Sequence, residues 1–275
     1  MWIDNKSASF YRGGAPEVGR FNEAVSRRRE EYPYSKKDNC KAVKDISEDG
    51  YSIIEQAFDL KVIKKLKEEF ESCLRNGTVK TDKYFTTVLD PLLNCPTILD
   101  VAFGDIITSI ASEYFECCPA LGTFNFRRSY INAGGPYTTQ LFHCDPNSIK
   151  FIKFFIYLND VMSLDDGPLC LVPASLRKKP VAWDSKYRWE DEEIKKLYGQ
   201  DAVTPMLAST GDLIVATTNA FHRGAPPEKQ ERTMLTLNYV VHPEEWKSPQ
   251  FKIKTDDFNK LEEHKKPLAD FLVKV

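Results

Sequence analysis

Five short runs of β-branched and aromatic residues constrain the fold of this chain more than any other feature. Each run is bounded by Gly, Pro, Asp or Asn, residues that favour turns. The runs are TFNFRRSYINAGG, IKFFIYLNDV, GPLCLVPAS, GDLIVATTNAF and TMLTLNYVVHP. Several short strands without a helix between each pair pack as two facing sheets or as a barrel. The sequence therefore predicts a mainly β fold with flanking α-helices, whose core is a double-sheet sandwich or a barrel, such as a jelly roll.

Helical patterns precede these runs. Tyr51 to Ile54 are predicted to form a short strand, and Asp59 is a candidate N-cap for a helix that Gly77 ends at C′. Apolar residues recur along this helix at spacings of three and four: Leu60, Ile63, Leu66, Phe70 and Leu74. A second helix is predicted over 104–118. We expect these N-terminal helices to buttress the sheet and assign them no chemistry.

The remaining segments are polar. Residues 1–45 include the charge-dense run SRRREEYPYSKKDNCK, which predicts an extended, solvated arm over the domain, or alternatively an arm that binds a partner. Residues 46–243 are expected to form one jelly-roll domain. Within it, residues 177–205 are long, charged and Trp-containing, which predicts an ordered, lid-like insert. Residues 244–275 predict a peripheral segment with a short helix.

Composition limits the partners and the compartment. The 38 basic and 40 acidic residues leave a formal net charge of −2, which argues against a general nucleic-acid or membrane-surface binder. No apolar run approaches the roughly 18 residues that cross a bilayer, and the first residues lack the pattern of a secretory signal. The seven cysteines include no C-x-x-C pair, which favours reduced thiols. We therefore expect a cytoplasmic protein, and the sequence leaves its oligomeric state open.

Three residues form a candidate metal site. His143 and Asp145 are two apart, and on a strand they point to the same face. His222 directly follows another predicted strand, which can bring it to the same point. Two imidazoles and one carboxylate make the facial triad of non-heme Fe(II) oxygenases. An H-x-D pair also arises by chance, and a histidine often has a structural role, so the spacing alone leaves both alternatives open.

Arg232 is the second candidate. It begins the apolar run RTMLTLNYV, where a guanidinium is costly unless it meets an anion, and its fork of donors suits a carboxylate. Thr236, four residues later, lies on the same strand face and can donate its hydroxyl to that carboxylate. The alternative is that Arg232 lies at the solvent end of the strand and pairs with Glu228 or Glu231.

Five segments together resemble the phytanoyl-CoA dioxygenase-like branch of the Fe(II)/2-oxoglutarate oxygenases over roughly residues 45–242. They follow one another in the family's order: EDGYSIIEQAFDLKVIKKLKEEF, QLFHCD, LNDVMSLDDGPLCLVPASL, GDLIVATTNAFHRGAP and RTMLTLNYV. Two positions depart from the family's pattern. Leu176 stands where many members have the His of P-G-S-H, and Met234 stands where many have Ser or Thr. The resemblance implies a double-stranded β-helix, the cupin-like jelly roll.

The resemblance also implies a chemistry. His143, Asp145 and His222 would hold Fe(II), and Arg232 and Thr236 would bind the distal carboxylate of 2-oxoglutarate, the co-substrate used with O2. Gln140 and Asn132 are further candidates for the co-substrate site. Related halogenases have a small residue in place of the aspartate, so Asp145 favours a hydroxylase. The expected reaction hydroxylates an unactivated C–H bond of a small polar or carrier-bound molecule and releases succinate and CO2.

Neighbouring side chains have weaker assignments. Phe151, Lys153, Phe155 and Tyr157 share one strand face after Asp145; they either pack in the core or line the pocket, with Lys153 meeting a substrate anion. Arg127 and Arg128 are adjacent and so point to opposite faces, which allows at most one to face inward. Cys144 is expected to pack away from the site, and His242 and His264 are expected to be structural.

Three rival functions remain at this point. A cupin-like protein that binds a metal without 2-oxoglutarate has no need for a buried Arg232. A binding module without catalysis would not require the three ligands and the arginine to be intact. A nucleic-acid demethylase shares the chemistry but usually needs a basic groove, of which the net charge of −2 gives no sign.

Overall fold

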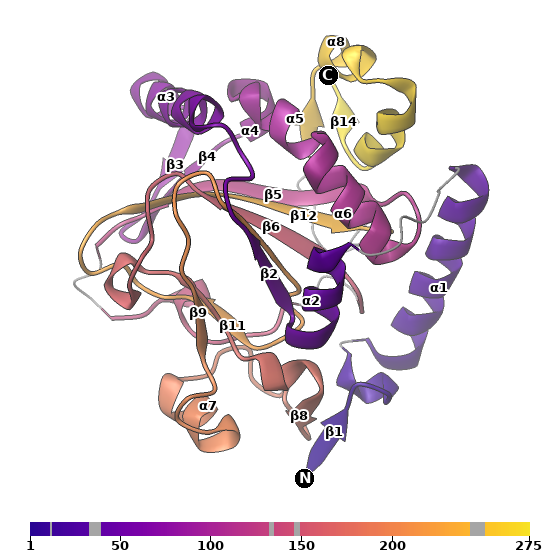
Figure 1. Cartoon of the computed structure of the whole chain (residues 1–275), viewed down its shortest axis with the longest axis vertical. Helices are drawn as coiled ribbons and strands as arrows, with labels where there is room; N and C mark the ends of the chain where they lie inside the picture. Colours follow the sequence, from indigo (N-terminus) through magenta and orange to yellow (C-terminus); the bar gives the residue numbers. More distant parts are fainter. Residues whose placement is uncertain (12, 33–39, 132–134, 146–148, 243–250) are drawn as a thin grey trace.

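A seven-stranded antiparallel sheet forms the centre of the fold (Figure 1). The computed structural model describes residues 1–11, 13–32, 40–131, 135–145, 149–242 and 251–275. The strands of this major sheet are, in spatial order, β2 (Tyr51–Ile54), β10 (Leu213–Ala216), β6 (Ile152–Tyr157), β12 (Arg232–Val240), β5 (Ala120–Ser129), β4 (Phe85–Val88) and β3 (Val79–Thr81). Strands distant in sequence thus become neighbours, which brings the predicted site residues within reach of one another.

A smaller antiparallel sheet faces the major sheet. Its strands lie in the order β11 (His222–Gly224), β7 (Leu169–Leu171) and β9 (Thr204–Met206). The side chains of Leu169, Leu171 and Met206 pack with Phe155 and Tyr157 of β6 in one buried cluster between the two sheets. Two facing antiparallel sheets agree with the predicted jelly roll, and the predicted fold class is confirmed.

Alternation along β6 explains why the major sheet is covered on both faces. Ile152, Phe154 and Ile156 pack into the cluster shared with the helices, whereas Phe155 and Tyr157 pack toward the smaller sheet. β12 alternates in the same way: Leu235, Leu237 and Tyr239 pack with the helices, whereas Met234 packs toward the smaller sheet. The face of the major sheet that meets the smaller sheet is called the inner face below.

Helices cover the outer face of the major sheet (Figure 1). They are α2 (Lys41–Asp49), α3 (Leu60–Asn76), α4 (Pro91–Asn94), α5 (Thr97–Ala102) and α6 (Asp105–Phe115). As predicted, Asp59 caps α3 by accepting from the Lys61 amide at 2.7 Å, and Gly77 ends it with a φ of 69°. The prediction that Leu60 belongs to the buried face is wrong: it is 64% exposed, at the first turn before α3 reaches the sheet.

The expectation of an extended N-terminal arm is wrong, because Gly14–Glu31 form helix α1. Phe21, Ala24, Val25 and Arg28 are spaced as one helical face and are buried. The Arg28 side chain donates to the backbone oxygens of Cys118, Pro119 and Pro267. These contacts tie α1 to segments far away in sequence, and the charge-dense composition of residues 26–41 conceals them.

The insert and the tail are small elements at the edge of the jelly roll. In the insert, β8 (Lys178–Pro180) pairs with β1 (Trp2–Asp4), and α7 (Asp191–Tyr198) follows. In the tail, β13 (Lys252–Ile253) and β14 (Val273–Lys274) flank α8 (Thr255–Lys260). The short 3₁₀ turns are Ala8–Phe10, Thr138–Gln140, Leu164–Asp166, Pro173–Leu176 and Glu263–Ala269. Among the described residues, no helix is both long and apolar enough to cross a membrane.

Candidate metal centre

The three predicted metal ligands lie together on the smaller-sheet side of the inner face. His143, Asp145 and His222 each offer a ligand atom within 4.8 Å of the others. His222 Nε2 lies 3.2 Å from Asp145 Oδ2, and His143 Nε2 lies 3.7 Å from Asp145 Oδ1. Both imidazoles are buried, at 3% and 6% exposure for His143 and His222. The structure therefore brings His222 to His143 and Asp145, which precede it in the sequence by 79 and 77 residues.

Backbone pairing fixes this convergence. The amide of His143 donates to the carbonyl of His222 at 2.9 Å, and the amide of His222 donates back to the carbonyl of His143 at 2.9 Å. The amide of Asp145 then donates to the carbonyl of Thr218 at 3.1 Å. These bonds join His143 and Asp145 to the segment that carries His222. The ligand side chains therefore cannot separate unless this backbone pairing breaks.

Hydrogen bonds orient both imidazoles for metal binding. His143 Nδ1 lies 2.9 Å from the Leu141 carbonyl, and His222 Nδ1 lies 3.1 Å from the Ala220 carbonyl. A carbonyl accepts only, so each Nδ1 carries the proton and each Nε2 presents a lone pair toward Asp145. Burial, together with the neighbouring His222, lowers the pKa of His143 to about 3. The His143 ring is therefore neutral, the form that binds a metal.

Asp145 supplies the negative charge. Burial opposes its ionisation, but the Lys153 ammonium and His222 outweigh burial and hold the pKa of the Asp145 carboxyl well below its usual range. Thr218 Oγ1 donates to Asp145 Oδ2 at 2.6 Å, and Lys153 Nζ donates to the same oxygen. Two imidazoles and one ionised carboxylate are the ligand set of a facial triad, so the residues present fit a divalent iron ion.

Arg232 is buried without an acidic partner. Its side chain is 4% exposed, and burial lowers the pKa of the guanidinium. Nη2 donates to Ser129 Oγ at 3.1 Å, whereas Nε and Nη1 have no hydrogen-bond partner among the described residues. The alternative pairing with Glu231 is wrong, since that carboxylate lies 3.9 Å from Nε of Arg128 on the outer face. A buried guanidinium with unpaired donors is the arrangement that binds a carboxylate.

Gly224 connects Arg232 to the metal ligands. A Cβ placed on Gly224 would lie 3.2 Å from Nη2 of Arg232, so the guanidinium lies against the bare backbone of β11. Gly224 follows His222 by two residues, which is about 7 Å along a strand. Thr236 is half-buried on the inner face, in register with Phe155. The anion site and the metal site are thus close enough for one small ligand to reach both.

The other predicted site residues have mixed outcomes. Gln140 is buried, and its Oε1 accepts from the Tyr137 amide at 2.9 Å, so its carbonyl caps the turn before His143. Asn132 lies outside the described residues. Lys153 forms an ion pair with Asp145, a residue of the site itself. One prediction had been that Lys153 contacts an anion of the substrate. A role of Gln140 and Asn132 in binding 2-oxoglutarate stays a prediction.

Residues expected to lie away from the site do so. Cys144 packs in a separate cluster under the insert with Phe142 and Val172. His242 lies 3.1 Å from Glu17 of α1, and His264 is 69% exposed beside Glu262. Neither histidine belongs to the group of metal ligands, and a structural role for the two stays a prediction.

Ser175 was not predicted as part of this site. It is fully buried, its Oγ donates to the Val172 carbonyl at 2.7 Å, and it accepts from the Phe221 amide at 2.7 Å. Because Phe221 directly precedes His222, this hydroxyl positions the backbone that carries the ligand. The sequence signal was the Ser retained in V-P-A-S-L. The next residue, Leu176, packs against Gly50 at the end of α2.

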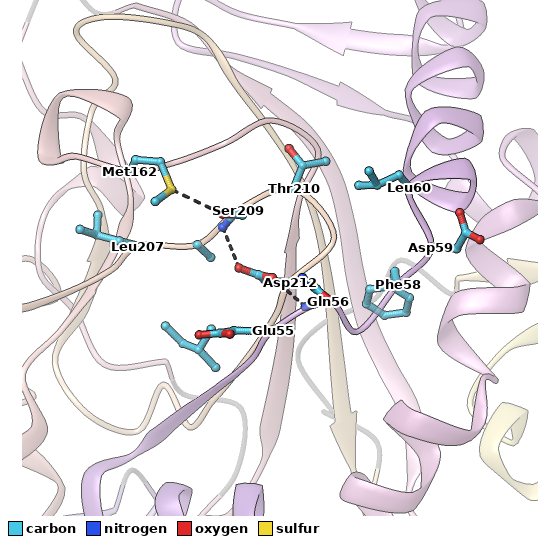
Figure 2. Close-up of a pocket in the computed structure, with 12 residues that line it drawn as sticks. Glu55, Gln56, Phe58, Asp59, Leu60, Met162, Leu207, Ser209, Thr210 and Asp212 are labelled. Carbon is cyan, nitrogen blue, oxygen red and sulfur yellow. Dashed lines mark hydrogen bonds between the residues drawn. The ribbon is translucent and has the colours of Figure 1, made fainter.

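A groove between β2 and the Leu207–Asp212 loop is a different surface (Figure 2). Asp212 is its central acid, but the Gln56 and Ser209 amides already donate to this carboxylate at 2.9 and 2.7 Å. Asp59 at its rim caps α3. Asp212 and Asp59 thus hold local backbone in place, and the groove lies at the opposite end of β10 from His222, so we do not assign it to the metal site.

Comparisons with known proteins support the fold. No model of a protein family matches this chain, and no curated protein sequence matches it either. Among solved structures, it is similar to HygX from Streptomyces hygroscopicus with nickel and 2-oxoglutarate bound, at 13% identity, with a TM-score of 0.57 and coverage of 79% of this chain and 91% of HygX.

Two further structures show the same likeness. One is the epimerase SnoN in complex with Fe3+, alpha ketoglutarate and nogalamycin RO, at 16% identity and a TM-score of 0.60, covering 73% of this chain and 82% of SnoN. The other is EctD from S. alaskensis with bound Fe, at 15% identity and a TM-score of 0.60, covering 80% of this chain and 86% of EctD. At such identities the comparison establishes a shared jelly-roll fold.

Proposed function

We propose that this protein is an Fe(II)/2-oxoglutarate-dependent dioxygenase of the phytanoyl-CoA dioxygenase-like family that hydroxylates a small molecule. The observation that carries the proposal is Arg232, a 4%-exposed guanidinium with two unpartnered nitrogens beside a His-Asp-His triad. A metal-binding protein that does not use 2-oxoglutarate would provide no anion to pair with this buried guanidinium. Similar structures that contain bound iron, nickel or 2-oxoglutarate support the same class.

Each residue then has a defined task. His143, Asp145 and His222 would hold the iron, and Arg232, with the Thr236 hydroxyl, would bind the C5 carboxylate of 2-oxoglutarate. Bound iron supplies the redox chemistry by which O2 and 2-oxoglutarate convert a C–H bond to C–OH, with succinate and CO2 as the other products. The protein's own contribution is to orient both substrates and to keep Asp145 ionised through Lys153 and Thr218.

Asp145 favours hydroxylation over halogenation, because its carboxylate fills a position that a halide would otherwise need. Epimerase and carbocyclase activities are named for two of the similar structures. Those reactions use the same iron and co-substrate, so product analysis decides between them. We also propose a cytoplasmic location, which agrees with seven cysteines that form no disulfide in the described residues.

Anaerobic titration tests the proposal. Metal-free protein receives Fe(II) and then 2-oxoglutarate, and the visible absorption of iron chelated by the 2-oxo acid is recorded. We expect the band in the wild type and its loss in His222→Ala. His264→Ala is the matched control, since this histidine is 69% exposed, and it should retain the band. Wild-type protein that binds Fe(II) but gives no band would contradict the proposal.

A further inference from the structure

We propose that the substrate carries a carboxylate or a phosphate group and that Arg127 binds this group on the inner face. The proposal rests on the proposed function and narrows it to anionic substrates. Arg127 lies on β5, in register with Met234 of β12, and Ser129, two residues later, is the hydrogen-bond partner of Arg232. Arg127 and Arg232 therefore occupy neighbouring positions on the same face.

The Arg127 side chain is held in place but is not neutralised. Its Nε donates to Thr87 Oγ1 at 3.0 Å, and its guanidinium lies 4.7 Å from the centre of the Phe85 ring. Both Nη atoms have no acceptor and no carboxylate within 4.0 Å among the described residues. A guanidinium fixed through Nε and stacked on a ring presents its remaining fork of donors to a ligand.

Two other arginines, which we regard as structural, form ion pairs with carboxylates. Arg128, the next residue, forms an ion pair with Glu71 on the outer face, and Arg223 lies 2.8 Å from Asp191. Arg127 and Arg232 have no such pair. Burial lowers the pKa of Arg127, Arg232 lowers it further, and Asp82 acts in the opposite direction. The Asp82 carboxylate is engaged by the amides of Tyr84 and Phe85, at 2.7 and 2.8 Å.

The charges around the triad also favour an anionic substrate. Lys153 already offsets Asp145, and the charges of a bound ferrous ion and a 2-oxoglutarate dianion would cancel, so the two arginines leave the site with a net positive charge. Arg188 of the insert adds another cation near the triad: its guanidinium lies over the Tyr187 ring, whose centre is 6.5 Å from that of the His143 ring. Asn125, on the same face as Arg127, is exposed, so this part of the inner face opens to solvent. A cationic, solvent-accessible part of the inner face in a chain of net charge −2 selects an anion.

The test compares Arg127→Met with Arg128→Met, adjacent arginines on opposite faces. Small molecules extracted from the source organism are separated by anion-exchange resin into a retained pool and a flow-through pool. Each pool is added to protein loaded with Fe(II) and 2-oxoglutarate, and 2-oxoglutarate-dependent oxygen consumption is measured. Alkaline phosphatase treatment of the retained pool distinguishes the two groups: stimulation disappears for a phosphate ester and persists for a carboxylate.

We expect only the retained pool to stimulate the wild type, and Arg127→Met to lower this stimulation by about tenfold or more. The KM for 2-oxoglutarate should change by less than about threefold, and Arg128→Met should behave as the wild type. Stimulation by the flow-through pool alone, equal stimulation in Arg127→Met, or no response of a wild type that forms the iron absorption band would overturn the proposal. A raised KM for 2-oxoglutarate in Arg127→Met would do so too, by assigning Arg127 to the co-substrate. Absence of the band in the wild type would instead contradict the proposed function.

Discussion

Replacing Arg232 by Met should increase stability while it impairs co-substrate binding. In the protein without 2-oxoglutarate, Nε and Nη1 of Arg232 are buried and unpartnered. Each unsatisfied buried donor costs about 1 to 3 kcal/mol, and the bond to Ser129 that is lost contributes about 1 kcal/mol. Since Met fills much of the same volume, we expect the free energy of unfolding to rise by about 1 to 5 kcal/mol. For a chain of this size that corresponds to a Tm increase of about 2 to 10 °C.

The same substitution removes the hydrogen bonds to the C5 carboxylate. Charge-assisted bonds contribute about 1.5 to 3 kcal/mol each, so the KM for 2-oxoglutarate should rise by about tenfold or more. Thermal unfolding of metal-free protein and 2-oxoglutarate-dependent oxygen consumption measure the two effects. Arg128→Met is the control: it loses an ion pair at a residue that is 21% exposed, so it should destabilise by at most about 1 kcal/mol and leave the KM unchanged. An Arg232→Met protein that is less stable than the wild type and keeps its KM would refute this reasoning.

Three further predictions follow from residues around the ligands. Ser175→Ala leaves the buried Phe221 amide without an acceptor, so urea unfolding should show a loss of about 1 to 3 kcal/mol, and an unchanged midpoint would contradict it. Gly224→Ala places a Cβ 3.2 Å from Nη2 of Arg232, so the KM for 2-oxoglutarate should rise about threefold or more at nearly constant stability; an unchanged KM would show that the guanidinium has room to move. The pKa of His143 is about 3 in the fold against 6.5 normally, so only the unfolded chain takes up this proton between those values. In metal-free protein, the neutral His143 ring therefore contributes fully to the free energy of unfolding above pH 6.5. This contribution is lost as the pH falls, by up to about 1.4 kcal/mol per pH unit. His143→Gln should remove this dependence of the free energy of unfolding on pH.

The jelly roll could be predicted because its signal is local. In β6, alternate residues must face the helices and the smaller sheet, so Ile152 to Tyr157 form an apolar run whose length and turn residues mark a buried strand. The triad could be predicted for a related reason: His143 and Asp145 lie two apart, and His222 follows a strand. Where these ligands meet depends on strand pairing, which the motif order of the resemblance supplied.

The missed features depend on contacts between distant segments. The buried face of α1 consists of Phe21, Ala24, Val25 and Arg28, and the last of these is stabilised by carbonyls near residues 118 and 267. Nothing in the local composition distinguishes such an arginine from its solvated neighbours. Similarly, the contact of Lys153 with Asp145 requires the two segments to be placed in three dimensions, because both an open pocket and a core position are compatible with its strand face.

The central claim is that one ferrous ion and one diacid bind between the triad and Arg232. A crystal structure of the protein with Fe(II) and 2-oxoglutarate, grown without oxygen and recorded at the iron absorption edge, measures this directly. We predict an anomalous peak within bonding distance of His143 Nε2, Asp145 and His222 Nε2. We also predict that the C5 carboxylate of 2-oxoglutarate contacts the Arg232 guanidinium. An iron peak elsewhere, or a 2-oxoglutarate molecule that does not contact Arg232, would contradict the account.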